Sequence, residues 1–154
     1  MTFFEHSPFL EQAFKPFGEA YKNRKQLSIK EQEILYGVAF SFYETGNYEK
    51  ATGFFTELVL SNPFVVSFWK GLASAKQMAQ DYKAALHAWA IVCILDAKDP
   101  LPHFHAAENL YQLQEKTEAL KALNCAEALL QKEQVALKQK IGFLKELYQC
   151  HGKN

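Results

Sequence analysis

The sequence predicts an all-α solenoid of three helix–turn–helix repeats, with an N-terminal helical arm before them and a C-terminal capping helix after them. One observation behind this prediction is that small residues recur every 34 positions, as the series Ala39, Ala73, Ala107 and the series Ala51, Ala85, Ala119. The other is that larger apolar residues lie three or four positions from these alanines, the spacing of one helix face. Small residues at matching places allow two helices to cross closely.

The pattern is clearest in the first repeat, between Leu35 and Pro63. Its core-type residues are Leu35, Val38, Ala39, Phe42, Tyr48, Ala51, Phe55 and Leu58. The template returns 34 residues later at Trp69, Leu72, Tyr82, Trp89 and Val92, and once more at Ala106, Leu110, Leu123 and Ala126. A helix–turn–helix period of 34 residues is the signature of the tetratricopeptide repeat. We therefore expect repeats at residues 32–65, 66–99 and 100–133.

The segment before the repeats, residues 1–31, is expected to be a helical arm. Its apolar residues recur at three- and four-residue steps, which gives an apolar helical face. Pro16 and Gly18 interrupt that face, so we expect a kink or two short helices. Two roles stay open for the arm, a cap that covers the first repeat or a self-association surface. The residues proposed for self-association are Phe9, Leu10, Phe14 and Phe17, since the phenylalanines of the arm exceed what one cap needs.

Local signals place the ends of the repeat helices. Ser28 and Glu31 have the spacing of a capping box, in which each side chain accepts a hydrogen bond from the other residue's backbone N–H. Gly46 supplies the positive φ angle of the first turn, and Pro63 ends the second helix because proline disfavours the α region in the residue before it. Asp99 is expected to cap the third repeat. We expect repeat helices at about residues 28–45, 48–61, 66–79, 82–95, 101–113 and 117–131.

The last segment, residues 134–154, is expected to form an amphipathic helix that ends near Gln149 and is followed by a frayed tail. Its apolar residues lie on one side, and lysine, glutamine and glutamate residues lie on the other. The apolar set is Val135, Leu137, Ile141, Leu144 and the pair Leu147/Tyr148. The last repeat of a solenoid exposes apolar surface unless such a helix covers it. We therefore expect this helix to be the C-terminal cap.

The charge balance and the cysteines exclude several classes of function. Lysine plus arginine and aspartate plus glutamate both number 17, so no net field attracts nucleic acid or an anionic membrane. No stretch reaches about 18 uninterrupted apolar residues, so we expect no membrane insertion. The start of the chain lacks a basic signal-peptide region, and Cys93, Cys125 and Cys150 are few and far apart. These features indicate a reducing, cytosolic compartment.

We expect neither an enzyme nor a cofactor or metal site. The sequence contains no GxSxG, P-loop, GxGxxG or HExxH pattern. His103 and His105 are two positions apart, which on a helix directs them to different sides. Cys93 and Cys125 fall on apolar helix faces, where buried and inert thiols are the usual outcome. Binding is the activity that remains.

In stacked helix–turn–helix repeats the first helix of each pair lines the concave face, so residues one position after its core residues point into a groove. In the first repeat these are Tyr36, Phe40 and Tyr43, which the internal core does not need. An aromatic groove suits an extended peptide whose apolar side chains enter pockets. The full set of expected groove residues is Tyr36, Phe40, Tyr43, Lys70, Ser74, Gln77, Phe104, Glu108 and Tyr111. The alternative is that the N-terminal segment folds into the groove and covers the aromatic side chains.

Two segments also carry a family resemblance. The first repeat opens with Leu35-Tyr36, Ala39-Phe40 and Tyr43. The third repeat is introduced by DAKDP at residues 96–100 and continues with PHFHAAE at residues 102–108. Over about residues 30–130 the sequence resembles the class II chaperones of bacterial type III secretion systems, which serve translocator proteins.

The resemblance implies a chaperone of the bacterial cytoplasm that binds hydrophobic translocator proteins before export. That family holds a short proline- and leucine-containing client segment in its concave groove, and Tyr36, Phe40 and Tyr43 match groove positions of the family. Some members dimerise through N-terminal helices. The resemblance therefore implies a homodimer and agrees with the self-association role of the arm.

Other classes of function are weighed against this one. A generic tetratricopeptide-repeat adaptor or scaffold would join other proteins through the same groove. A clamp for acidic C-terminal peptides needs several lysines or arginines in the groove, and only Lys70 and Lys76 are candidates. A regulatory subunit of an enzyme is supported by neither motif nor charge.

Overall fold

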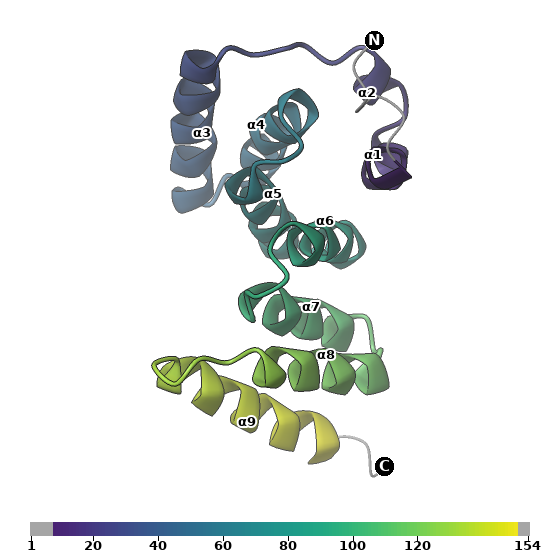
Figure 1. Ribbon diagram of the computed structural model, residues 1–154, viewed down its shortest axis with the longest axis vertical. Helices are drawn as coiled ribbons and strands as arrows, with labels where there is room; N and C mark the ends of the chain where they lie inside the picture. Colours follow the sequence, from purple (N-terminus) through teal and green to yellow (C-terminus); the bar gives the residue numbers. More distant parts are fainter. Residues whose placement is uncertain (1–7, 151–154) are drawn as a thin grey trace. The chain divides into compact units, whose positions relative to one another are not determined.

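The computed structural model describes residues 8–150, and every regular element in that range is helical (Figure 1). Residues 1–7, the start of the predicted arm, and residues 151–154, in the predicted frayed tail, lie outside the described residues. The described α-helices are α1 (Pro8–Phe14), α2 (Glu19–Lys22), α3 (Ile29–Glu44), α4 (Tyr48–Ser61), α5 (Val66–Met78), α6 (Tyr82–Leu95), α7 (Leu101–Gln112), α8 (Lys116–Ala128) and α9 (Val135–Cys150). The predicted all-α repeat fold is confirmed. The chain divides into two compact units, residues 1–79 and 80–154, which we describe in turn.

The arm of the first unit packs onto the start of α5. Its interruption is the 3-10 helix η1 (Lys15–Phe17), which separates α1 from α2. The Phe14 ring stacks on Tyr21 with centroids 4.4 Å apart and lies 5.8 Å from the Trp69 ring. Phe9 stacks on Phe64 at 6.1 Å. Figure 1 shows α1 and α2 on the side of α4 and α5, apart from α3. The described arm therefore caps α5 and not α3.

The start of α3 is fixed by the predicted capping box. The Ser28 hydroxyl accepts from the Glu31 N–H at 3.3 Å, and the Glu31 carboxylate accepts from the Ser28 N–H at 2.8 Å. The hydrogen bonds from the Ser28 backbone and side chain, and then the charge of Lys25, hold the pKa of Glu31 below its usual value. The N–H of Leu27 donates to the Ser61 hydroxyl at 2.9 Å, which ties the linker before α3 to the end of α4.

One backbone geometry closes the first helix of each repeat. Gly46 has a φ of 79° after α3, where the Asn47 N–H donates to the Phe42 carbonyl at 2.8 Å. This left-handed residue after the helix is the Schellman arrangement, which satisfies carbonyls of the last turn. The equivalent positions 34 and 68 residues later are Gln80 and Gln114, with φ angles of 64° and 65°. A residue with a Cβ pays roughly 1–2 kcal/mol for this conformation, so these two turns are strained.

The core of the first unit has alanines where its helices cross. Ala39 on α3, Ala51 on α4 and Ala73 on α5 are all 0% exposed. Phe55 and Leu58 of α4 are 1% and 0% exposed. The predicted small-residue series is therefore completely buried in this unit.

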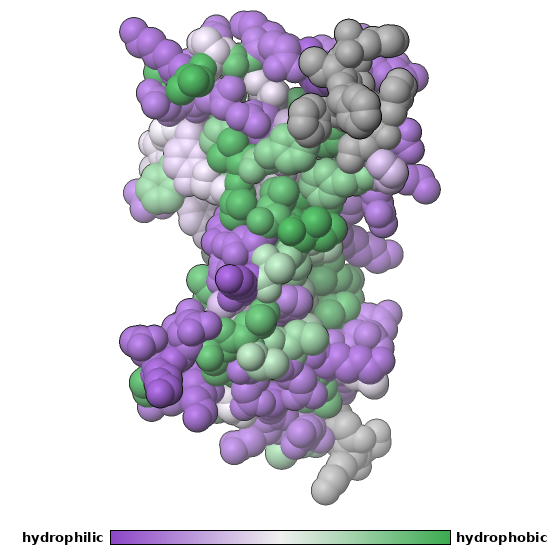
Figure 2. Space-filling view, in the orientation of Figure 1, coloured by the Kyte–Doolittle hydropathy of each residue, from purple (hydrophilic) through white to green (hydrophobic). Residues whose placement is uncertain are grey.

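The second unit has the same kind of core, completed by α9. Its buried cluster consists of Phe104, Ala107, Ala119, Leu123, Ala126, Ile141 and Tyr148. Ile141 and Tyr148 come from α9 and are 0% and 4% exposed, so α9 covers the apolar side of the last repeat. The face of α8 and α9 visible in Figure 2 is mainly hydrophilic, as the end of a repeat array requires. The role of the last helix as a cap is confirmed for this unit.

Two residues assigned to the core of the repeats are exposed, and so is Val135 at the start of α9, with 57% of its surface accessible. Val38 of α3 is 37% exposed and its neighbour Ile34 is 61% exposed, because the arm packs on α5 and leaves the outer side of α3 uncovered. Cys125 of α8 is exposed, because the covered row of that helix is formed by Leu123 and Ala126 instead. Both residues are apolar and lie on a helix face that no other helix covers, and the sequence pattern does not show which faces are covered.

The strained turn at Gln114 gives a stability prediction. Gln114→Gly is expected to raise the free energy of unfolding by about 1 kcal/mol, because glycine has no Cβ to clash in the left-handed region. The reverse change in the first unit, Gly46→Ala, is expected to lower it by about 1 kcal/mol. Urea unfolding followed by circular dichroism measures both changes. A Gln114→Gly variant no more stable than the parent chain would show that this turn stores no strain.

Candidate peptide-binding groove

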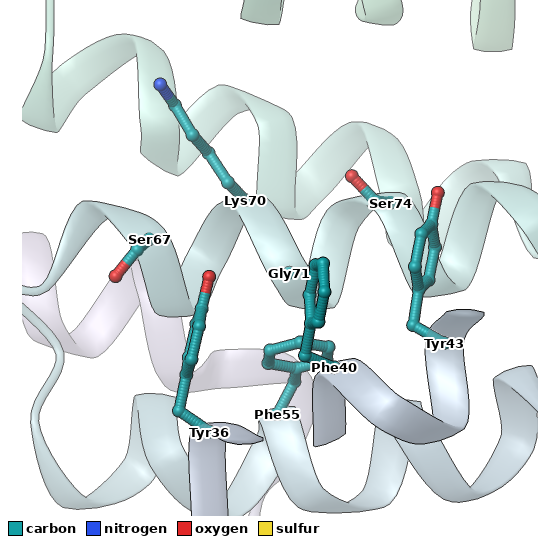
Figure 3. Close-up of a pocket in the computed structure, with 8 residues that line it drawn as sticks. All are labelled: Tyr36, Phe40, Tyr43, Phe55, Ser67, Lys70, Gly71 and Ser74. Carbon is teal, nitrogen blue, oxygen red and sulfur yellow. The ribbon is translucent and has the colours of Figure 1, made fainter. Parts of the chain in front are cut away.

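An open pocket of about 200 Å³ lies between α3 and α5 of the first unit. Figure 3 shows the rings of Tyr36, Phe40 and Tyr43 side by side along the α3 wall, with the Phe55 ring beneath them. The facing wall is α5. We call this pocket the α3–α5 slot, and its lining residues are Tyr36, Phe40, Tyr43, Phe55, Ser67, Lys70, Gly71 and Ser74.

The lining residues of the two walls have the same spacing but differ in size, since α3 carries aromatic side chains and α5 carries small ones. The aromatic row on α3 occupies positions i, i+4 and i+7, and Ser67, Gly71 and Ser74 on α5 repeat that spacing with small side chains. Residues spaced in this way share one face of a helix. A row of this length is about 10 Å long at ~1.5 Å per helical residue. It is therefore as long as about three residues of extended peptide, at ~3.3 Å each.

Ring contacts hold the aromatic wall in place. The Tyr36 ring meets Phe55 edge to face at 5.8 Å and lies 5.9 Å from the Phe68 ring. Phe40 stacks against Tyr36 with centroids 6.5 Å apart and an angle of 12°. Phe55 is 1% exposed, whereas Phe40 is 45% exposed. The slot therefore has a fixed floor and an apolar side wall that a ligand can cover.

Polar groups lie at the mouth of the slot. In Figure 3 the hydroxyls of Tyr36 and Tyr43 and the ammonium group of Lys70 point away from the Phe55 ring. Burial, with the neighbouring Tyr48 as a smaller cause, raises the pKa of Tyr43 above its ordinary value. Its hydroxyl is thus protonated at neutral pH and able to donate a hydrogen bond. Such donors suit the backbone carbonyls of an extended segment.

Five of the nine predicted groove residues line the slot, namely Tyr36, Phe40, Tyr43, Lys70 and Ser74. Gln77, nearly one turn beyond Ser74 on α5, is not among the lining residues. The remaining three residues belong to α7 of the second unit. Sequence reasoning thus found the aromatic wall and part of the facing wall.

The α7 residues have other contacts inside the second unit. Phe104 is 6% exposed in the core cluster, so its prediction as a groove side chain is corrected here. A Glu108 carboxylate oxygen lies 2.8 Å from the Nδ1 of His105. Tyr111 stacks on Tyr148 at 3.9 Å. Burial, with smaller contributions from Glu108 and Tyr111, raises the pKa of Tyr148 to about 12. The α7 row is therefore partly used by the fold.

Sequence reasoning missed three lining residues, Phe55, Ser67 and Gly71. Phe55 was assigned to the core, where it does lie, but one edge of a core ring is also the floor of the slot. Ser67 and Gly71 have small side chains, which give no signal in a search for aromatic or charged residues. Their spacing with Ser74 was the available signal, because it matches the aromatic row.

The residues proposed for self-association are used within the chain in this structure. Leu10 and Phe14 are 5% and 3% exposed, and Phe17 packs 6.3 Å from Trp69. A second copy can reach these side chains only after the arm leaves α5. The described part of the arm contributes no lining residue to the slot, so the predicted alternative of an N-terminal plug does not apply to residues 8–22.

The described residues give no indication of a metal site or of a membrane-spanning helix. Within residues 8–150, no group of three or more His, Cys, Asp or Glu side chains has the arrangement of a metal site. Among the described helices, none combines the length and the apolarity that a bilayer span needs. Burial, with Asp99 and Cys125 as smaller causes, raises the pKa of the Cys93 thiol to about 11.

The high pKa of Cys93 predicts its reactivity. The thiolate is the reactive form, so at pH 8 Cys93 is expected to react with Ellman's reagent about a hundredfold more slowly than an ordinary free cysteine. Cys125 and Cys150 are exposed and should react first. Timed labelling with mass spectrometry measures this order, and Cys125→Ser should remove one fast site. Fast labelling of Cys93 in the folded protein would contradict the burial argument.

Comparisons with known proteins agree with the geometry. The family model of the tetratricopeptide repeat matches residues 33–58 and 67–99. Low calcium response locus protein H of Yersinia pestis is 35% identical over 105 residues, which are 68% of this chain and 62% of that protein. The match thus spans less than two thirds of the curated relative.

Solved structures extend the likeness over more of the chain. The type III secretion chaperone SycD of Yersinia enterocolitica, in complex with a peptide of the translocator YopD, aligns with a TM-score of 0.78 and 29% identity, covering 84% of this chain and 100% of that one. PcrH from Pseudomonas aeruginosa aligns with a TM-score of 0.74 and 28% identity, covering 82% and 96%. The chain thus has a tetratricopeptide-repeat fold and resembles the translocator chaperones of type III secretion.

Proposed function

We propose that this protein is a type III secretion chaperone of the bacterial cytoplasm, which holds an extended segment of a hydrophobic translocator in its concave groove. The observation that supports this most is the open, aromatic α3–α5 slot in a chain that aligns with SycD bound to a YopD peptide. PcrH has likewise been solved with the chaperone binding regions of PopD and PopB. The client of this protein is therefore of the same class.

The physical basis of the proposed activity is simple binding. A translocator carries apolar segments that aggregate when they are free, and holding one segment lowers the concentration of the free protein by mass action. The slot offers apolar area for a client side chain and hydroxyl donors for its backbone. Aromatic anchors at the centre of such interfaces typically contribute about 1–4 kcal/mol each. No catalytic step is required, so we infer that the protein is not an enzyme.

The alternative of a generic adaptor is less well supported. Adaptors of the carboxylate-clamp kind bind acidic C-terminal peptides through several cationic side chains. Lys70 is the single charged residue among the described residues that line the slot, and the other lining residues are aromatic, serine or glycine. This lining favours an apolar client segment over an acidic one.

We also propose that the working form is a homodimer joined through the N-terminal arm. SycD has been solved in an alternative dimer, which shows that a related chaperone self-associates. In this chain the arm presents an apolar face centred on Leu10 and Phe14, which is docked on Trp69. Release of the arm from α5 would make that face available to a second copy.

The slot assignment predicts a loss of client binding. Tyr36→Ala combined with Tyr43→Ala is expected to weaken binding about tenfold or more, because two side-wall contacts are lost. Fluorescence anisotropy with short overlapping peptides of YopD, PopD and PopB measures the affinity. Phe143→Ala on α9, where the side chain is 65% exposed, is the matched control and should bind like the parent. Unchanged affinity in a folded double variant would refute the slot as the binding site.

The arm assignment predicts a change of oligomeric state. A chain lacking residues 1–25 is expected to sediment as a monomer, with α3 to α9 retained, because the arm adds only α1, η1 and α2. Sedimentation velocity gives the mass, and circular dichroism checks the helical content. If the shortened chain has the same number of subunits as the full chain, the arm does not form the dimer.

A further inference from the structure

The missing side chain at position 71 makes room for Phe55, the floor residue of the slot. A Cβ placed on Gly71 would lie 2.2 Å from Cε1, 2.5 Å from Cζ and 2.6 Å from Cδ1 of Phe55. Real Cβ atoms essentially never come this close to a neighbour, so any other residue at position 71 must displace the ring or the helix. The Phe55 ring is 1% exposed and meets Tyr36 edge to face, so it has little freedom to move away.

The next repeat shows what a side chain at this position does. The residues 34 positions after Phe55 and Gly71 are Trp89 and His105, both in the second unit. The His105 ring stacks on Trp89 with centroids 4.7 Å apart and an angle of 20°. The Nδ1 of His105 also pairs with the Glu108 carboxylate at 2.8 Å. In the first unit, glycine lets the floor ring occupy the place that a side chain would take. In the second unit, the histidine side chain stacks on the equivalent ring instead.

We propose that Gly71 and Phe55 together set the depth of the α3–α5 slot, and thereby the size of the one apolar client side chain that it accepts. The inference rests on the proposed function, since it specifies how the same site selects its client. A volume of about 200 Å³ is close to the cavities of about 150 Å³ that hold a benzene-sized group. The ligand class is therefore a peptide segment with one compact apolar anchor, no larger than a phenylalanine ring. Phe55 contacts that anchor from below, and Gly71 is a positioning residue that acts through Phe55.

The test combines binding selectivity with a double-mutant cycle. The probes are the short overlapping peptides of YopD, PopD and PopB, and the best binder is remade with its apolar anchor as alanine, leucine or phenylalanine. Gly71→Ala is expected to weaken binding of the leucine peptide roughly tenfold or more, and of the alanine peptide less. Phe55→Leu, which deepens the floor, is expected to shift the preference towards the phenylalanine peptide.

The double variant separates a role in the slot from general damage to the fold. Gly71→Ala together with Phe55→Leu is expected to recover binding and thermal stability, because the smaller floor residue removes the clash. Gly37→Ala is the matched control, since a Cβ at Gly37 on α3 meets nothing within 4 Å. It should leave both affinity and selectivity unchanged.

The outcomes distinguish this inference from the proposed function. If the parent protein binds none of the peptides, peptide capture itself is refuted. The proposal that Gly71 and Phe55 set the depth of the slot, which we call the depth rule, is then refuted as well. If the parent binds but a folded Gly71→Ala chain keeps the same affinity and the same order of anchors, the depth rule alone is wrong. An unchanged anchor preference in Phe55→Leu overturns it as well.

Discussion

The close crossing of α3, α4 and α5 is the constraint on which the rest of the first unit depends. Ala39, Ala51 and Ala73 are completely buried among these helices, so a larger side chain at any of them has to displace its neighbours. Adding even one methylene to a closely packed core typically costs about 1–3 kcal/mol. The large rings of α3 are consequently displaced to the neighbouring row, where they form one wall of the slot. The slot is thus a by-product of how closely these helices pack.

The helix α5 has two roles on opposite faces. Its Trp69 side chain is completely buried, donates its indole N–H to the Pro63 carbonyl at 2.8 Å and receives the Phe14 and Phe17 rings of the arm. Gly71, two positions later and about 200° further around the helix, faces the slot. Packing from the arm therefore supports α5 from the side that the slot does not use. A rigid wall lets a pocket distinguish side chains by size, because a wall that yields accepts them all.

Much of this fold could be predicted because its signals are periodic. The 34-residue spacing located the alanines of the core, and the aromatic row of α3 followed from a shift by one residue. The same shift failed at Phe104, because in the second unit that ring is packed into the core cluster with α8 and α9 residues. A shift of one residue from the core positions of a helix predicts an exposed face only when no other helix covers that face. Which faces are covered is a property of the assembled helices, and the sequence pattern does not contain it.

The partner of an apolar helix face cannot be read from the residues of that helix alone. Phe14 and Phe40 look alike in the sequence, since each lies on an amphipathic helix among other aromatic residues. In the folded chain Phe14 is 3% exposed against Trp69, whereas Phe40 remains 45% exposed beside the slot. Burying apolar surface is worth roughly 25 cal/mol per Å², so the ring left exposed retains unused binding energy. The arm satisfies its own apolar face within the chain, whereas in the proposed function the aromatic wall of α3 is completed by a ligand.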